Sequence, residues 1–252
     1  MIVEYLRPKT MDEVLKLLER KEPKTLPLGG GTIVAKSAGD PVVVVDLQEL
    51  GLNSISKEKS EIVIGATATL SEVEKFIHNS DFSEAVQIQA GKNLRNTGTI
   101  AGMICTADGR SPLLTLLLGL DAKLIWEPGK KEISLGNWLP QRKSWVDGKL
   151  IASISLSDSK YRFASIGRSP KDQPILCCVL AKWPGNRLRV AIGGFGTIPT
   201  LVLDGNVNDD IETAVKNALH DADDLWASAD YRMEAGSRLC LRLKQDLMAD
   251  NG

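Results

Sequence analysis

The chain has 252 residues, of which 43% are hydrophobic and 25% charged, and its formal net charge is −1. This composition is ordinary for a soluble globular protein. The balanced charge gives no reason to expect nucleic acid or an anionic membrane as a partner. No apolar run reaches the roughly 18 residues that a membrane span needs, and the first residues show no apolar signal-peptide region. We therefore expect a cytoplasmic protein without a membrane span.

Cysteine and histidine are sparse and do not show metal-binding spacing. The four cysteines form no C-x-x-C pair, and the two histidines, His78 and His220, lie in polar, helix-like contexts. Zinc and iron–sulfur sites need closely spaced ligands of these types. We expect reduced thiols, no metal site in this chain, and no catalytic residue of the Ser–His–Asp or Cys–His kind.

The first part of the chain, residues 1–54, is predicted to be a small α/β unit. Thr10 and Glu13 form a capping-box pattern in front of an apolar stripe, which predicts a helix over residues 10–21. The next expected elements are strands at 25–28 and 42–47, with a glycine loop and a polar turn at 36–41 between them.

The second part, residues 55–150, repeats the same signals. Thr69 and Glu72 form another capping-box pattern before an apolar stripe. The expected elements are a charged turn at 57–60, a strand at 61–68, helices at 69–78, 82–90 and 113–120, and a strand at 122–126.

The third part, residues 151–252, reads as strands followed by helices. Strands are expected at 150–156, 161–166 and 188–193, a buried segment at 175–183, and amphipathic helices at 211–220 and 231–248. This order predicts a small antiparallel sheet covered by helices. The whole chain is then an α+β protein, with two α/β subdomains followed by a C-terminal α+β domain.

Two glycine-containing stretches are candidates for ligand binding. The first is Arg95–Met103, with sequence R-N-T-G-T-I-A-G-M, and the second is Gly29–Val34, with sequence G-G-G-T-I-V. Neither has the spacing of a Rossmann fingerprint or a Walker P-loop. Taken singly, each could be a helix-capping turn or a flexible strand end. Together they fit two loops that present backbone N–H groups to one extended anion such as a pyrophosphate.

At these residues the sequence resembles the FAD-binding (medium) subunit of the molybdenum hydroxylases, the family of xanthine dehydrogenase and aerobic carbon monoxide dehydrogenase. That family carries A-G-G-[TQH]-[DS]-L, matched by Gly29–Val34, and R-N-x-G-T-I-G-G-N, matched by Arg95–Met103. The resemblance covers nearly the whole chain, in order. Its further matches are Tyr5-Leu6-Arg7-Pro8, Val45-Asp46-Leu47, Leu118-Gly119-Leu120-Asp121-Ala122 and Ala229-Asp230-Tyr231-Arg232.

The resemblance implies that FAD carries the redox chemistry while the protein binds and orients it. The cofactor-binding residues that it implies are Gly29, Gly30, Gly31, Thr32, Ile33, Val34, Thr99, Ile100, Ala101, Gly102, Met103, Asp108 and Ser165. It also implies partner chains: a small subunit with [2Fe–2S] clusters and a large subunit with molybdopterin. Electrons would pass from the clusters through FAD to NAD⁺, oxygen or a quinone.

The sequence departs from the family pattern at the expected site. Met103 replaces an asparagine, Pro112 an aspartate, Ile33 a polar residue and Ser165 a lysine, whereas Arg168 and Asp172 keep the rest of K-x-x-R-x-x-x-D. Each replaced side chain could form hydrogen bonds that its replacement cannot form in the same way. We therefore expect FAD to bind weakly. Two alternatives stay open: a non-catalytic structural subunit that has lost FAD, and a stand-alone flavoprotein.

Overall fold

The computed structural model describes residues 1–33, 41–144, 148–169 and 172–249, which form two compact units. Unit 1 combines Met1–Phe76, Lys92–Thr106 and Lys123–Leu156, and unit 2 combines Ile77–Gly91, Ala107–Ala122 and Ser157–Gly252. Each unit is therefore built from three separate segments of the chain. The expected division at residues 54 and 150 stays a prediction.

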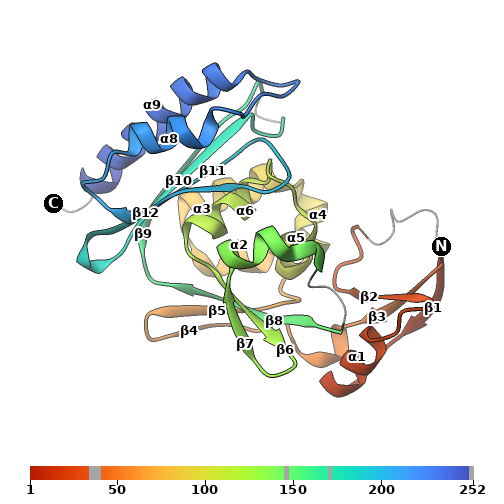
Figure 1. Ribbon diagram of the computed structural model, residues 1–252. Helices are drawn as coiled ribbons and strands as arrows, with labels where there is room; N and C mark the ends of the chain where they lie inside the picture. The colour runs from red at the N-terminus through yellow and green to blue at the C-terminus, as the bar shows by residue number, and fades with distance from the viewer. Residues whose placement is uncertain (34–40, 145–147, 170–171, 250–252) are drawn as a thin grey trace. The chain divides into compact units, whose positions relative to one another are not determined.

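Unit 1 begins with a three-stranded parallel sheet in the order β1-β3-β2 (Figure 1). Its strands and its helix are β1 (Ile2–Leu6), α1 (Met11–Leu18), β2 (Lys24–Leu28) and β3 (Val42–Asp46). The central strand β3 is buried along its whole length. Val14 and Leu18 of α1 pack with Val45 into one hydrophobic cluster, which fixes the helix on the sheet.

Two of the matched motifs meet in this sheet. The Tyr5 hydroxyl, on β1, donates a hydrogen bond to the buried Asp46 carboxylate at the end of β3. This bond raises the pKa of the Tyr5 hydroxyl, because loss of the proton would place a second negative charge beside the carboxylate. Asp46 also accepts the backbone N–H of Gln48 at 2.9 Å. The Y-L-R-P and V-D-L motifs are thus explained by packing within unit 1.

The rest of unit 1 is a five-stranded sheet with short helices. The strand order is β4-β5-β8-β6-β7. The strands are β4 (Ile55–Glu58), β5 (Glu61–Gly65), β6 (Lys123–Glu127), β7 (Lys131–Ser134) and β8 (Leu150–Ser157). The helices are α2 (Leu70–Ile77), α4 (Lys92–Thr97), α5 (Ile100–Thr106) and α7 (Leu135–Trp138), and the 3₁₀ turns are η2 (Gln48–Leu50) and η3 (Leu139–Ser144).

Unit 2 is an antiparallel sheet with helices on both faces. The strand order is β12-β11-β10-β9. The strands are β9 (Lys160–Ile166), β10 (Leu176–Lys182), β11 (Arg187–Gly193) and β12 (Thr200–Asn206). The helices are α3 (Ser80–Gln89), α6 (Pro112–Gly119), α8 (Ile211–Leu219) and α9 (Ala229–Ala249), with the 3₁₀ turn η4 (Pro184–Asn186). In Figure 1, α8 and α9 lie side by side along the sheet.

Strand β10 has both of its faces covered. Leu176, Cys178 and Leu180 point into the core shared with α8 and α9. The residues between them point to α6: the Cys177 thiol contacts the Thr115 hydroxyl at 3.5 Å, and Val179 lies against the helix at Gly119. Burial raises the pKa of the Cys177 thiol to about 11. Because both faces of β10 are buried, the sequence of this strand is a continuous apolar run.

The mixed α and β fold and the C-terminal antiparallel sheet with two helices are confirmed. Both capping boxes are present: the Thr10 hydroxyl accepts the Glu13 N–H at 3.3 Å, and the Thr69 hydroxyl accepts the Glu72 N–H at 3.3 Å. The polar turn expected at residues 36–41 lies outside the described residues except at its last position.

Several expected elements were wrong or missing. The charged turn expected at 57–60 is confirmed only at residues 59–60, because Lys57 and Glu58 belong to the edge strand β4, on which they face solvent. Strands β1 and β12 were not expected, since their alternation of buried and exposed residues is weak. The stretch Arg95–Met103 is largely helical: α4 and α5 meet at Gly98 and Thr99, which alone connect them.

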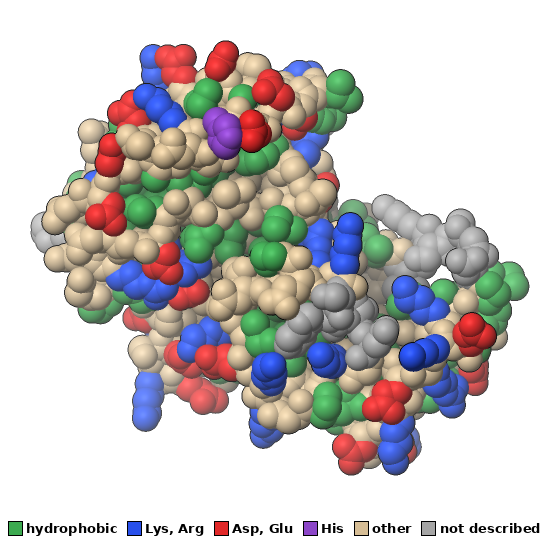
Figure 2. Space-filling view, in the orientation of Figure 1, with side chains coloured by type: hydrophobic (Ala, Val, Ile, Leu, Met, Phe, Trp, Pro, Cys, Tyr) green, Lys and Arg blue, Asp and Glu red, His purple; other side chains and the backbone are tan. Residues whose placement is uncertain are grey.

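The charged side chains on the face drawn in Figure 2 are interspersed by sign. This distribution agrees with the net charge of −1. None of the helices formed by the described residues combines the length and the apolar character that crossing a membrane requires.

Candidate cofactor-binding site

The glycine loop follows β2 at the carboxyl end of the parallel sheet, which is where open α/β sheets bind ligands. Gly31 has a φ of +70°, a left-handed conformation that residues with a Cβ atom rarely adopt. Residues 29–32 are half-buried and Ile33 is exposed. Val34, also expected at this site, lies outside the described residues.

The structure brings the glycine loop against the connection between α4 and α5, within unit 1. A methyl group on Gly29 would lie 2.7 Å from the Thr99 hydroxyl oxygen, and one on Gly30 would overlap the Thr97 carbonyl oxygen. Any larger residue at either position would push the two loops apart. Glycine is therefore required at these positions by the contact between the loops, and the two candidate stretches lie in direct contact.

Residues Thr99–Met103 support the glycine loop, and the backbone amides of residues 100–103 are bonded within the protein. The N–H groups of Ile100 and Ala101 donate to the carbonyl oxygens of Ala68 and Ala66, at 2.9 and 3.2 Å. Those of Gly102 and Met103 donate to the side chain and the carbonyl oxygen of Thr99, at 3.2 and 2.9 Å. The expectation that this stretch offers its amides to a ligand is thus not met at residues 100–103, whose amides are used inside the protein.

The side chains of this stretch are also turned inward. Ile100 is fully buried and Met103 is 9% exposed, so both belong to the core under α5. Pro112 is buried at the first turn of α6, where the side chain of Ser111 caps the helix. The replaced asparagine and aspartate positions of the family pattern are therefore packing positions here. Ile33, by contrast, is 46% exposed beside the glycine loop.

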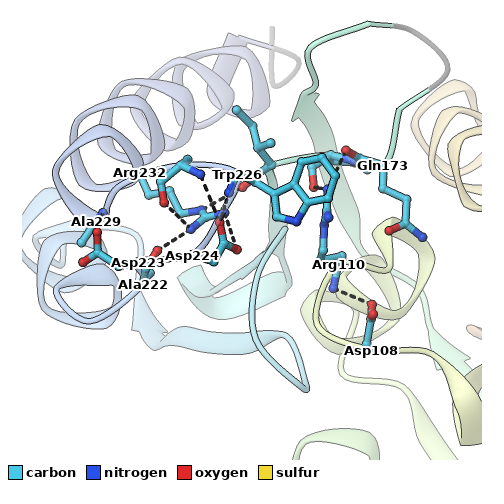
Figure 3. Close-up of polar contacts among 12 residues, drawn as sticks. Asp108, Arg110, Gln173, Ala222, Asp223, Asp224, Trp226, Ala229 and Arg232 are labelled. Atoms are coloured by element: carbon cyan, nitrogen blue, oxygen red, sulfur yellow. Dashed lines mark hydrogen bonds and ion pairs between the residues drawn. The ribbon is translucent and has the colours of Figure 1, made fainter.

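The expected site residues Asp108 and Ser165 belong to unit 2. Ser165 lies in β9, where it pairs with Cys177 and is half-buried. Asp108 is exposed, and its carboxylate accepts the N–H of Arg110 at 2.9 Å (Figure 3). The guanidinium of Arg110 donates to the carbonyl oxygen of Gln173 at 3.1 Å, which joins this loop to the segment before β10.

The side chain of Trp226, which no sequence pattern marks, lies over this arginine. The Arg110 guanidinium is 4.3 Å from the centroid of the Trp226 ring, and that of Arg168 is 5.4 Å from it. Arg168 also donates to the Trp226 carbonyl oxygen at 3.0 Å. These residues, with Asp172 and Gln173, line a small pocket of about 170 Å³ in unit 2. Trp226 stands in a loop without periodicity, so no pattern could have indicated its position.

The Arg232 side chain holds the loop that carries Trp226. It is fully buried in α9 and donates two hydrogen bonds to Asp224, at 2.8 and 2.9 Å (Figure 3). It also donates to the carbonyl oxygens of Ile175, Ala222 and Ala227. The arginine of the A-D-Y-R motif is thus a structural anchor.

The residues of the facing loops suit a dinucleotide phosphate. Gly31 takes the left-handed conformation that such a turn requires, and main-chain N–H groups in a turn of this kind can bind anions without a side chain. Within the described ranges, no three His, Cys, Asp or Glu side chains gather as metal ligands. The fold and the contact between the two loops make this the candidate cofactor-binding part of unit 1.

Comparison with known proteins gives the family. Residues 1–157 match the family model described as FAD binding domain in molybdopterin dehydrogenase. The chain belongs to this family, and the resemblance seen in the sequence is confirmed.

Individual relatives agree with this assignment. The chain is 26% identical over 245 residues to the uncharacterized protein YgfM of Escherichia coli K12, covering 92% of this chain and 91% of that one. It is 31% identical over 134 residues to the nicotinate dehydrogenase FAD-subunit of Eubacterium barkeri, covering 49% of this chain and 45% of that one. Its fold is similar to that of carbon monoxide dehydrogenase from Hydrogenophaga pseudoflava, with a TM-score of 0.80, 19% identity, and coverage of 98% and 97%.

Proposed function

We propose that this chain is the FAD-binding, electron-transferring subunit of a molybdenum hydroxylase-type dehydrogenase. The observation that carries the proposal is the contact of Gly29 and Gly30 with Thr97 and Thr99, which builds one cradle from two distant stretches. The family membership of residues 1–157 supports FAD as the ligand of that cradle.

In this proposal the main-chain amides of residues 29–32 hold the pyrophosphate of FAD. Residues 99–103 form the wall behind them and keep the glycine loop in place. Asp108 and Ser165 in unit 2 are further candidate contacts with the cofactor. When bound, FAD would supply two-electron and one-electron redox chemistry. The protein's part is to bind and orient it and to exclude competing reactions.

The partners in this proposal are an iron–sulfur small subunit and a molybdenum large subunit. The chain's own sequence has no cluster or molybdopterin motif, and the names of its relatives include an FAD-subunit. Electrons would arrive from the partner's clusters and leave to NAD⁺, oxygen or a quinone. Purification from the native host should recover both partners with this chain, whereas full turnover by this chain alone would contradict the assembly.

A second candidate function is that of a structural subunit that has lost FAD. The exposed Ile33 favours it, because an apolar side chain stands where the family has a polar one beside the glycine loop. The visible absorption spectrum of the purified complex separates the two functions, since oxidised flavin absorbs in the visible range. Titration of FAD into the isolated chain then measures the affinity, which we expect to be weak.

A further inference from the structure

The first two residues of the R-N-x-G-T-I motif, Arg95 and Asn96, contact helix α2. The Arg95 guanidinium lies 3.5 Å from the Glu74 carboxylate on α2, and the two side chains are only 16% and 18% exposed. The Ser71 hydroxyl, also on α2, donates to the Asn96 side-chain oxygen at 2.7 Å. Both motif side chains therefore bind helix α2 from the end of α4.

The backbone on either side of Thr99 is joined to the start of the same helix. Leu70 N–H donates to the Gly98 carbonyl oxygen, and Ile100 N–H donates to the Ala68 carbonyl oxygen, both at 2.9 Å. These bonds surround the antiparallel bridge between Thr69 and Thr99. Gly29 packs against Thr99. The position of Thr99 is thus set by α2 and by residues 68–69, which precede this helix.

From this geometry we propose that Arg95 and Asn96 are positioning residues, which act on the cofactor through α2 and not by touching it. This inference rests on the proposed function, since the ligand whose loop is positioned is FAD. The carboxylate of Glu74 offsets the charge of Arg95 and would repel a phosphate placed beside it. An arginine held in such a pair is suited to fixing the Thr97–Thr99 connection and poorly suited to binding the pyrophosphate.

The test compares two changes at the ion pair, Glu74→Gln and Arg95→Met, with the double variant. If the pair only positions the loop, each single change should raise the Kd for FAD about tenfold. The double variant should bind no more weakly than either single variant, because the pair acts as a unit. The matched control is Glu234→Gln, which removes a carboxylate from the exposed Arg238–Glu234 pair on α9 and should leave the Kd unchanged.

Amide hydrogen exchange of the chain without FAD gives a second readout, which does not depend on cofactor binding. The amides of Leu70 and Ile100 should exchange faster in Glu74→Gln and Arg95→Met, while those of β10 keep their rates. If the wild-type chain binds no FAD, the proposed function fails, and this exchange measurement alone decides the positioning role.

Two results would overturn the inference. If Arg95→Met weakens FAD binding while Glu74→Gln leaves the Kd unchanged, the arginine binds the cofactor directly. If neither variant speeds the exchange of Leu70 and Ile100, the ion pair does not hold the loop.

Discussion

Glycine at position 30 shows how a single atom can decide whether two loops form one site. The missing Cβ lets the backbone of the glycine loop rest on the Thr97 carbonyl oxygen. The sequence indicated a glycine-rich ligand loop, and a flexible strand end was the competing reading. The contact with Thr97 shows that Gly30 is needed for packing between the two loops. Neither sequence-based interpretation included this role.

The change Gly30→Ala should therefore separate the loops. The added methyl group meets backbone atoms, which cannot rotate away, so we expect a loss of about 1–3 kcal/mol in the free energy of unfolding and weaker FAD binding. Urea unfolding and FAD titration measure the two effects. Gly91→Ala is the matched control, because a methyl group there meets no atom within 4 Å. Equal effects of the two changes would contradict the role given to the contact.

The replaced family residues need a different experiment from the one that the sequence suggests. Restoring asparagine at position 103 would place a polar amide in the core under α5, because Met103 is 9% exposed. Ile33 is the better position, since it is exposed beside the glycine loop. We expect Ile33→Ser to lower the Kd for FAD by a few-fold, on the order of one added hydrogen bond. An unchanged Kd in titration would show that this side chain does not limit affinity.

At the scale of secondary-structure elements, the connection between α8 and α9 depends on a buried arginine. Residues 222–228 have no regular structure, and Arg232 binds them through Asp224 and the carbonyl oxygens of Ala222 and Ala227. The desolvation of Asp224 works against its charged form. The hydrogen bonds from Arg232 and the backbone outweigh this, so the pKa of the Asp224 carboxyl is lowered.

Replacing this anchor should be costly. Arg232→Met removes the guanidinium that binds Asp224 and three carbonyl oxygens, and we expect a loss of about 3–5 kcal/mol in the free energy of unfolding. Arg238→Met, on the same helix, removes a guanidinium that is 79% exposed and should change stability by less than about 0.5 kcal/mol. Thermal or urea unfolding compares the two variants, and similar losses would contradict the anchoring role.

The elements that sequence reasoning predicted are those with strong local signals. The helices behind Thr10 and Thr69 have both a cap and an apolar stripe, and both form as expected. The helices α4 and α5 were missed because glycine, threonine and asparagine disfavour helix by themselves. At the start of α5, backbone hydrogen bonds with residues 66–70 oppose that preference. The glycine loop could be predicted from sequence, whereas the contact of Trp226 with two arginines depends on the folded chain alone.

At the scale of the whole molecule, a network of four charges fixes the turn after α6 to the sheet of unit 2. Arg187 and Arg189 on β11 both contact Asp121 and Asp204, at 2.6 to 3.0 Å. The hydrogen bond from Arg187 is the largest cause of the lowered pKa of the Asp204 carboxyl. The D of the L-x-L-D-A motif thus has a structural role.

This network predicts a pH dependence of stability. Because the pKa of Asp204 is lower in the folded than in the unfolded chain, its contribution is present above the unfolded value of about 3.9 and is lost as the pH falls through the folded value. Asp204→Asn should therefore be less stable than wild type at neutral pH, and the difference should shrink below about pH 4. Urea unfolding from pH 7 to pH 3 measures it, and a constant difference would contradict the prediction.

The covering of β10 on both faces has a consequence for how the chain is made. Helix α6 is buried along all of its residues, Pro112–Gly119, and it packs on β10 and β11. Those strands leave the ribosome only after the 157 residues that match the family model. A chain stopped there should keep α6 and α3 without these strands and should aggregate, which light scattering would detect. During synthesis, the apolar helix α6 is exposed until β10 and β11 have been made. A chaperone that shields α6 should therefore raise the yield of folded protein.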